Sequence, residues 1–232
     1  MSLRAIRRGA LILGFLGIGL TLVFHWMVFF WVSTEATLGI SQRIFYIHVA
    51  GMWTGLLAFI MVAVCSVMYL WLRDDRLDQI GQAAAEGGLV FFAVGLTAGP
   101  LWARLAWGTW WTWEPRLTLS LLAFFIYIGY LMVRGATENR ERGKMFAAVI
   151  GVVGAINIPL IHVSVLWFRS LHPEPVVARQ EGPALPADML VTMLTAVLAW
   201  TVLLFALILL RYGAARLETR AEARALQRGA TA

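Results

Sequence analysis

The sequence IFYIHVAGMWTGLLAFIMVAVCSVMYLWL, residues 44–72, contains no Asp, Glu, Lys or Arg. A helix rises about 1.5 Å per residue, so this segment is long enough to cross a hydrocarbon core about 30 Å thick. A backbone in lipid must satisfy its polar groups internally, and a single helix does so. The segment therefore predicts a membrane-spanning helix.

Five further segments are apolar over a similar length. Residues 10–32 carry no charged side chain, and their apolar region is too long for a cleaved signal peptide. The third segment contains only Glu86, near its start. We expect six spans in all, at residues 10–32, 44–72, 83–103, 117–136, 144–168 and 188–210. The expected fold is all-α, a polytopic membrane protein with six transmembrane helices in one bundle.

The composition of the 232 residues supports this class. The chain is 60% hydrophobic and only 14% charged, which excludes an ordinary water-soluble domain. A net charge of +6 would suggest a nucleic-acid partner in a soluble chain, but here the basic residues lie between the apolar segments, so no nucleic acid is expected. The single cysteine, Cys65, excludes an internal disulfide and a multi-thiolate metal site.

The distribution of Lys and Arg predicts the orientation, because basic residues are retained on the cytoplasmic side. Four segments together hold 14 of these residues: the N-terminus, residues 73–82, residues 134–144 and the tail from Arg211. The other connections, residues 33–43, 104–116 and 169–187, hold five. Both termini are therefore expected in the cytoplasm, with these three connections on the outer side, which is periplasmic in a Gram-negative bacterium.

Two regions are expected. Residues 1–212 form the six-span domain, which includes an external loop at residues 102–118. Residues 213–232 form a basic cytoplasmic tail, which is either a short helix at the membrane surface or disordered.

The external loop has an unusual composition. The sequence WARLAWGTWWTWEPRLT at residues 102–118 contains five Trp within twelve residues. A single Trp at a membrane interface is usually an anchor, but an anchoring belt would occupy both interfaces. A cluster of this density on one side favours a broad apolar platform for a flat ligand.

Two histidines are expected on the same side as this loop. His48 opens the second span and His172 follows the fifth. Imidazole is a common axial ligand of haem iron, so two histidines approaching one porphyrin from opposite faces would complete a six-coordinate site. His162, within the fifth span, is expected to support a ligand or to be an alternative ligand, and His25 to pack in the first span.

The propionates of a haem would need cationic partners. Arg104, Arg116 and Arg169 are the outer-side cations nearest the aromatic segments. Arg116 could contact a propionate, or it could pair with Glu114, Glu35 or a lipid phosphate, and both alternatives stay open. For Arg104 and Arg169, pairing of the second kind is favoured over a propionate contact. Glu114 is expected to fix the loop through Arg116.

The sequence WGTWWTWEPRLT at residues 107–118 resembles the WWD signature of haem-handling proteins in cytochrome c biogenesis. The pattern is most similar to the CcmC family of system I, which has six spans with the signature in the second external loop. The resemblance extends to FYIHVAGMW at 45–53 and NIPLIHVSVLWFRSLHP at 157–173, and it covers most of residues 10–210. Larger relatives with the signature have more spans and longer external domains.

This resemblance implies a role for particular residues. The family's two external haem ligands fall on His48 and His172. The signature's acidic position is usually Asp and here is Glu114, one methylene longer and followed by Pro115. The candidate haem-binding residues are His48, His172, Trp107, Trp110, Trp111, Trp113, Glu114 and Arg116.

The resemblance also implies a function. The protein would hold haem b at the periplasmic face of the bacterial inner membrane and deliver it to the haem chaperone CcmE. It would work in an ABC transporter complex with CcmA, CcmB and CcmD. The sequence has no nucleotide-binding motif, so it is not expected to be an enzyme, and the ATPase would be a separate chain.

Two alternatives belong to other classes. A transport permease would need paired ionisable groups along a central path, and the spans offer few besides His25, His162 and Glu86. A cytochrome b-type electron-transfer subunit would place its haem ligands within the bundle, whereas His48 and His172 are expected at its outer edge.

Overall fold

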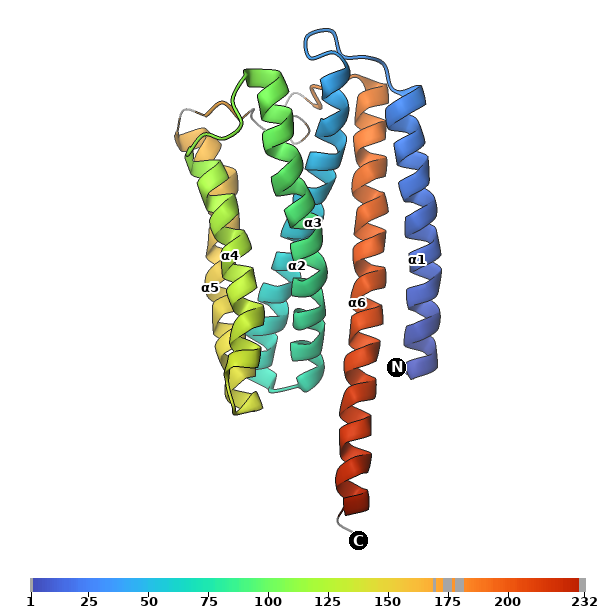
Figure 1. Ribbon diagram of the computed structural model, residues 1–232, viewed down its shortest axis with the longest axis vertical. Helices are drawn as coiled ribbons and strands as arrows, with labels where there is room; N and C mark the ends of the chain where they lie inside the picture. Colours follow the sequence, from blue (N-terminus) through green and yellow to red (C-terminus); the bar gives the residue numbers. More distant parts are fainter. Residues whose placement is uncertain (1, 169, 173–176, 178–181, 230–232) are drawn as a thin grey trace.

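The computed structural model describes residues 2–168, 170–172, 177 and 182–229, which form a bundle of long helices (Figure 1). The helices are α1 (Leu3–Trp26), extended by a π-helical turn (Met27–Trp31), α2 (Arg43–Leu72), α3 (Asp75–Trp107), α4 (Pro115–Ala136), α5 (Arg140–Trp167) and α6 (Ala187–Gly229). In the described part of the chain, six helical segments are long and apolar enough to cross a membrane, which confirms the predicted fold class.

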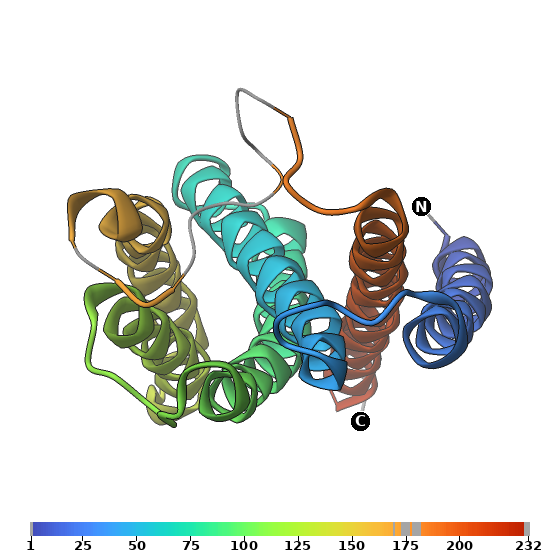
Figure 2. The same cartoon turned by 90° about the horizontal axis from the view of Figure 1, so that it is seen from above.

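The helices are arranged as three neighbouring pairs. Helices α2 and α3 form the central pair, α4 and α5 pack together on one side, and α6 and α1 pack together on the other (Figures 1 and 2). α1 makes its extensive contact with α6, so α6 separates it from the central pair.

Small residues bring α2 and α3 close together. A Cβ atom at Gly55 would lie 2.6 Å from the Cβ of Phe92, and one at Gly88 would lie 2.5 Å from the Cβ of Ala58. Small residues are typical of transmembrane helix contacts, because they let the backbones approach and increase van der Waals contact. The close α2–α3 contact provides a rigid centre for the bundle.

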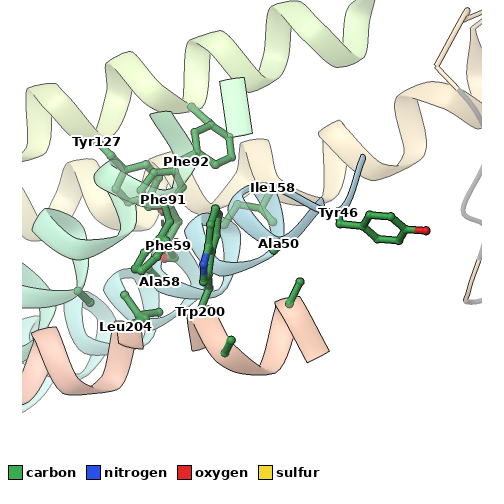
Figure 3. Packing of buried hydrophobic residues seen from close by; sticks show 14 of the residues in the cluster. Tyr46, Ala50, Ala58, Phe59, Phe91, Phe92, Tyr127, Ile158, Trp200 and Leu204 are labelled. Carbon is green, nitrogen blue, oxygen red and sulfur yellow. Dashed lines mark hydrogen bonds between the residues drawn. The ribbon is translucent and has the colours of Figure 1, made fainter. Parts of the chain in front are cut away.

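Aromatic side chains connect this centre to the outer pairs (Figure 3). The ring of Phe59 on α2 stacks on Tyr127 of α4 with centroids 3.7 Å apart, and the Tyr127 hydroxyl donates to the Phe59 carbonyl at 3.2 Å. On the other side, Phe91 of α3 lies 5.4 Å from Trp200 of α6. Contacts of this kind add to the stabilisation from apolar burial and keep the three pairs together.

The two ends of the bundle differ in their connections. At one end, here called the turn end, residues 73–74 and 137–139 join neighbouring helices by tight turns, in which Asp74 and Asn139 cap α3 and α5. At the other, here called the loop end, lie residues 32–42, residues 108–114 and the described residues between α5 and α6 (Figure 1). The segments predicted to share the outer side therefore lie together at the loop end.

A buried ion pair stabilises the turn end. Arg134 of α4 donates to Asp78 of α3 at 2.5 Å, and their side chains are only 12% and 5% exposed. Arg134 also donates to the Tyr130 hydroxyl at 3.4 Å. The pair connects the central helices to α4 in a region with little access to water.

The C-terminal residues extend α6. Residues 213–229 are helical, which is one of the two alternatives that the sequence leaves open, but they continue α6, which runs without interruption to Gly229 and projects beyond the turn end (Figure 1). Residues after Gly213 are rich in Ala, Arg, Leu and Glu, which are strong helix formers. Ion pairs from Arg211 to Glu86 at 2.7 Å and from Arg140 to Glu222 at 2.9 Å hold this part against α3 and α5.

Candidate functional site

A cavity of about 580 Å³ opens at the loop end. Its walls come from α2, α3, α4, α5 and α6 and from two connections, and most of the lining side chains are apolar or aromatic. Sites for organic ligands commonly have volumes of about 300–1,000 Å³ and a few polar groups in an apolar wall. The cavity is therefore large enough for a ligand of that class.

Two histidines face each other in this cavity. His48 comes from the second turn of α2, and His172 comes from the connection that follows α5. Their ring centroids are 6.4 Å apart, with an angle of 49° between the ring planes. The fold thus brings together the two histidines that the sequence singles out.

The orientation of His48 is fixed by the backbone of α3. Its Nδ1 lies 2.8 Å from the carbonyl oxygen of Gly95. A carbonyl can only accept, so Nδ1 carries the proton and the lone pair is on Nε2, which is the arrangement typical of a metal-binding histidine. Gly99 lies directly beneath the ring, because a Cβ atom there would be 2.9 Å from the His48 Cε1.

Tryptophans form much of the wall around the histidines. Trp107, Trp110 and Trp111, which the sequence assigns to an aromatic platform, all line the cavity. Trp102 also lines it, with its ring centroid 6.3 Å from that of His48 and 5.5 Å from that of Trp107. Within the described structure, the buried indole nitrogens of Trp102 and Trp111 have no hydrogen-bond partner. Both indole N–H groups are therefore buried donors without a partner in the described structure.

Trp113 and Glu114 are not among the described residues that line the cavity. Trp113 packs edge-on against Trp111 at 5.9 Å and is 76% exposed. Glu114 accepts a hydrogen bond from the backbone N–H of Leu171 at 2.9 Å. It therefore connects the Trp-rich loop to the residue before His172, and Pro115 then begins α4 at a position that favours proline.

Arg116 is the arginine that lines the cavity. Among the described residues it forms no ion pair, although the carboxylate of Glu114 is near enough to interact with its charge, so the fixing of the loop through these two residues stays a prediction. Arg104 donates to the Gly108 carbonyl at the end of α3. Arg169 lies outside the described residues. The expected alternative partner Glu35 accepts from backbone N–H groups of its own turn.

The remaining histidines have different surroundings. His162 of α5 lines the cavity, and its Nδ1 lies 3.1 Å from the Ile158 carbonyl. His25 is not among the lining residues; it packs on Phe24 with ring centroids 4.0 Å apart and bonds the Thr21 carbonyl at 2.7 Å. His25 therefore has the packing environment that the sequence predicts.

The fold and the cavity define a class of protein: a polytopic membrane protein with a histidine- and tryptophan-lined ligand cavity at one end of its bundle. Residues 2–227 match the family model described as CcmC, Heme exporter protein C, and the chain belongs to this family.

Three proteins of that name illustrate the similarity. The chain is 35% identical over 165 residues to Heme exporter protein C of Bradyrhizobium diazoefficiens, covering 71% of this chain and 63% of the relative. It is 31% identical over 176 residues to the Haemophilus influenzae protein, covering 75% and 71%. It is 34% identical over 136 residues to the Escherichia coli K12 protein, covering 58% and 55%. The matched region thus spans about three fifths of the first relative.

Proposed function

We propose that this protein is a membrane haem-handling subunit of cytochrome c maturation, which binds haem b between His48 and His172 and delivers it to the haem chaperone CcmE. The observation that carries the proposal is the facing pair of imidazoles, 6.4 Å apart between centroids. The family membership supports the haem-handling role.

The spacing of the pair fits two axial ligands of one metal. A histidine nitrogen binds a metal at about 2 Å, and the ring centre lies roughly 1 Å farther away, so two imidazoles on opposite sides of one ion have centroids about 6 Å apart. The His48–His172 separation agrees with this value. A direct hydrogen bond between the rings would bring their centroids closer.

The rest of the cavity suits a porphyrin. Indole rings contact a flat apolar macrocycle well, and the wall contains three tryptophans of the loop, Trp107, Trp110 and Trp111. Arg116 is half-buried in the same wall and would pair with a propionate. A chain that supplies both axial ligands would also keep water and oxygen from the iron.

The two ligands are held in different ways, which matters for release. His48 is fixed within α2 by the α3 backbone, whereas His172 lies outside the helices and is connected to the Trp-rich loop through Glu114 and Leu171. Displacement of that loop would therefore move His172 away from His48. Trp113, exposed at the loop end, belongs to the surface that CcmE would meet.

The proposed location is the bacterial inner membrane, with the loop end in the periplasm and both termini in the cytoplasm. The excess of Lys and Arg at the turn end and in the C-terminal part of α6 supports this orientation. CcmA, CcmB and CcmD are the proposed partners, and the ATPase activity belongs to a separate chain.

The test is an absorption spectrum of the detergent-purified protein, expressed with and without CcmE and then mixed with purified CcmE. We expect bands of low-spin haem b, accumulation of haem when CcmE is absent, and loss of haem to added CcmE. Absence of haem from every preparation would contradict the proposal. Stoichiometric haem that cycles reversibly and never transfers would favour an electron-transfer subunit instead.

The substitution Gly99→Ala is expected to weaken haem binding by at least about tenfold. The new Cβ would lie 2.9 Å from the His48 Cε1 and 3.1 Å from Nδ1, so the ring must turn and lose its bond to Gly95. Overpacking and one lost hydrogen bond together amount to about 1.5–4.5 kcal/mol, or at least tenfold in affinity. Titration with haem measures the change. Gly129→Ala is the matched control, because its Cβ would meet nothing within 4 Å, and equal affinities of the two variants would contradict the argument.

A further inference from the structure

The cavity continues beyond the histidine pair, along one face of α2. Val49, Trp53 and Leu56 line it at helical spacing, so they form a continuous strip. Leu56 lies eight residues after His48, which places it about 12 Å farther along the helix and within the apolar part of the span. The cavity therefore extends from the loop end well into the membrane-spanning region.

The deeper part of the cavity has a wall on each side. Helices α5 and α6 lie on opposite sides of α2, and no helix of the described chain crosses the face of α2 between them (Figure 2). Leu194 and Val197 of α6 form one wall, and Ile161 and His162 of α5 contribute to the other. Trp53 and Leu194 are 53% and 48% exposed. In a membrane these side chains would face lipid at this depth, so the cavity would open to the hydrocarbon.

An imidazole lies in this part of the wall. His162 is exposed and lines the cavity, and its Nδ1 bonds the carbonyl of Ile158, one turn earlier in α5. As at His48, this bond places the lone pair on Nε2. A polar side chain at the lipid-facing side of a span is energetically costly, so an exposed histidine there is a candidate for a functional role. The chemistry of His162 is that of a metal ligand.

We infer that haem enters the cavity laterally from the membrane, through an opening between α5 and α6, and that His162 is the first ligand of its iron. The inference rests on the proposed haem-handling function and adds the route and the first contact. The porphyrin is apolar and planar, so hydrocarbon is its natural solvent, and the strip of Val49, Trp53 and Leu56 gives it a continuous apolar surface. Arg116, nearer the loop end, then receives a propionate as the iron reaches His48 and His172.

The opening is tested by narrowing it with Leu194→Trp. A residue in an access route changes the rates of binding and release together, whereas a residue that only contacts bound haem changes mainly the rate of release. We expect both rates to fall by at least about tenfold, which corresponds to a barrier higher by about 1.4 kcal/mol. Binding is followed by stopped-flow absorption after haemin is added to the protein in phosphatidylcholine nanodiscs, and release by transfer to excess apomyoglobin.

The matched control is Leu198→Trp, four residues further along the same helix, where the leucine is 53% exposed but does not line the cavity. It should bind and release haem at wild-type rates. Val197→Phe, from the same wall as Leu194, repeats the test if the Leu194 variant does not assemble. The lateral route would be overturned if both wall variants bound and released haem at wild-type rates. It would also be overturned if their affinity for haem changed because only the rate of release had changed. If the wild-type protein itself binds no haem, the proposed function is wrong, and the route is then not the cause of the failure.

The role of His162 has a separate spectroscopic readout. Wild-type protein should show an early absorbing species that converts to the final low-spin spectrum, and His162→Ala should lose this species while reaching the same final spectrum. His25→Ala is the control, because His25 does not line the cavity. An early species that persists in His162→Ala would overturn the assignment of the first ligand.

Discussion

Replacing both His48 and His172 by alanine is expected to remove the low-spin haem spectrum of the purified protein. The two rings are the facing imidazoles of the cavity, and without them the iron has lost both proposed axial ligands. Each single variant should retain one ligand, so its haem should become high-spin and bind at least about a hundredfold more weakly, as expected when a directly coordinated ligand is lost. Absorption and resonance Raman spectra distinguish these states.

His25→Ala provides the control for the double variant, because it removes an imidazole of the same chain that packs on Phe24, away from the cavity. It should retain the wild-type spectrum. Retention of low-spin haem by the His48→Ala, His172→Ala protein would show that other residues bind the iron, and the proposed ligand pair would then be wrong.

The substitution Asp78→Ala is expected to destabilise the folded protein by about 3–5 kcal/mol, because it leaves the buried guanidinium of Arg134 without its carboxylate. The two side chains are 5% and 12% exposed and 2.5 Å apart, so water does not replace the lost partner. The hydrogen bond to Tyr130, at 3.4 Å, is a weak substitute. Unfolding by denaturant in mixed micelles measures the difference.

Two further variants separate the effect of the unpaired Arg134 charge from the effect of lost packing at the Asp78–Arg134 pair. Arg140→Ala removes a partner of the exposed pair with Glu222, whose side chains are 65% and 55% exposed, and should change stability by less than about 1 kcal/mol. The double variant Asp78→Leu, Arg134→Met should recover most of the loss, since an apolar pair needs no compensating charge. A loss in Asp78→Ala no larger than that in Arg140→Ala would contradict the argument.

The sequence predicts the helices better than their ends. The second span, expected at residues 44–72, is observed as Arg43–Leu72, because its ends coincide with polar residues. The third, expected at residues 83–103, is observed as Asp75–Trp107. Its first two turns are polar, so hydropathy does not detect them, although Asp74 caps the helix and acidic residues near its start stabilise the helix dipole.

The sequence also predicts some residues of the candidate site and not others. Histidine, tryptophan and arginine have distinctive chemistry, and His48, His172 and Arg116 do lie together in the cavity. Gly99 and Leu194 were not predicted, because a glycine beneath a ring and a leucine in an apolar wall differ in no visible way from those elsewhere in the spans. Trp102 belongs to the Trp-rich sequence at residues 102–118, but only the packing of α3 on α2 places it beside His48. Such roles depend on tertiary contacts.

The length of α6 has a mechanical consequence. It is one helix of 43 residues, about 64 Å long, with Leu194 and Val197 in the cavity wall near one end and a charged segment at the other. It contains no proline at which it could bend. A tilt of the charged end would therefore also move the residues of α6 that line the cavity, and α6 alone would couple the two ends of the bundle.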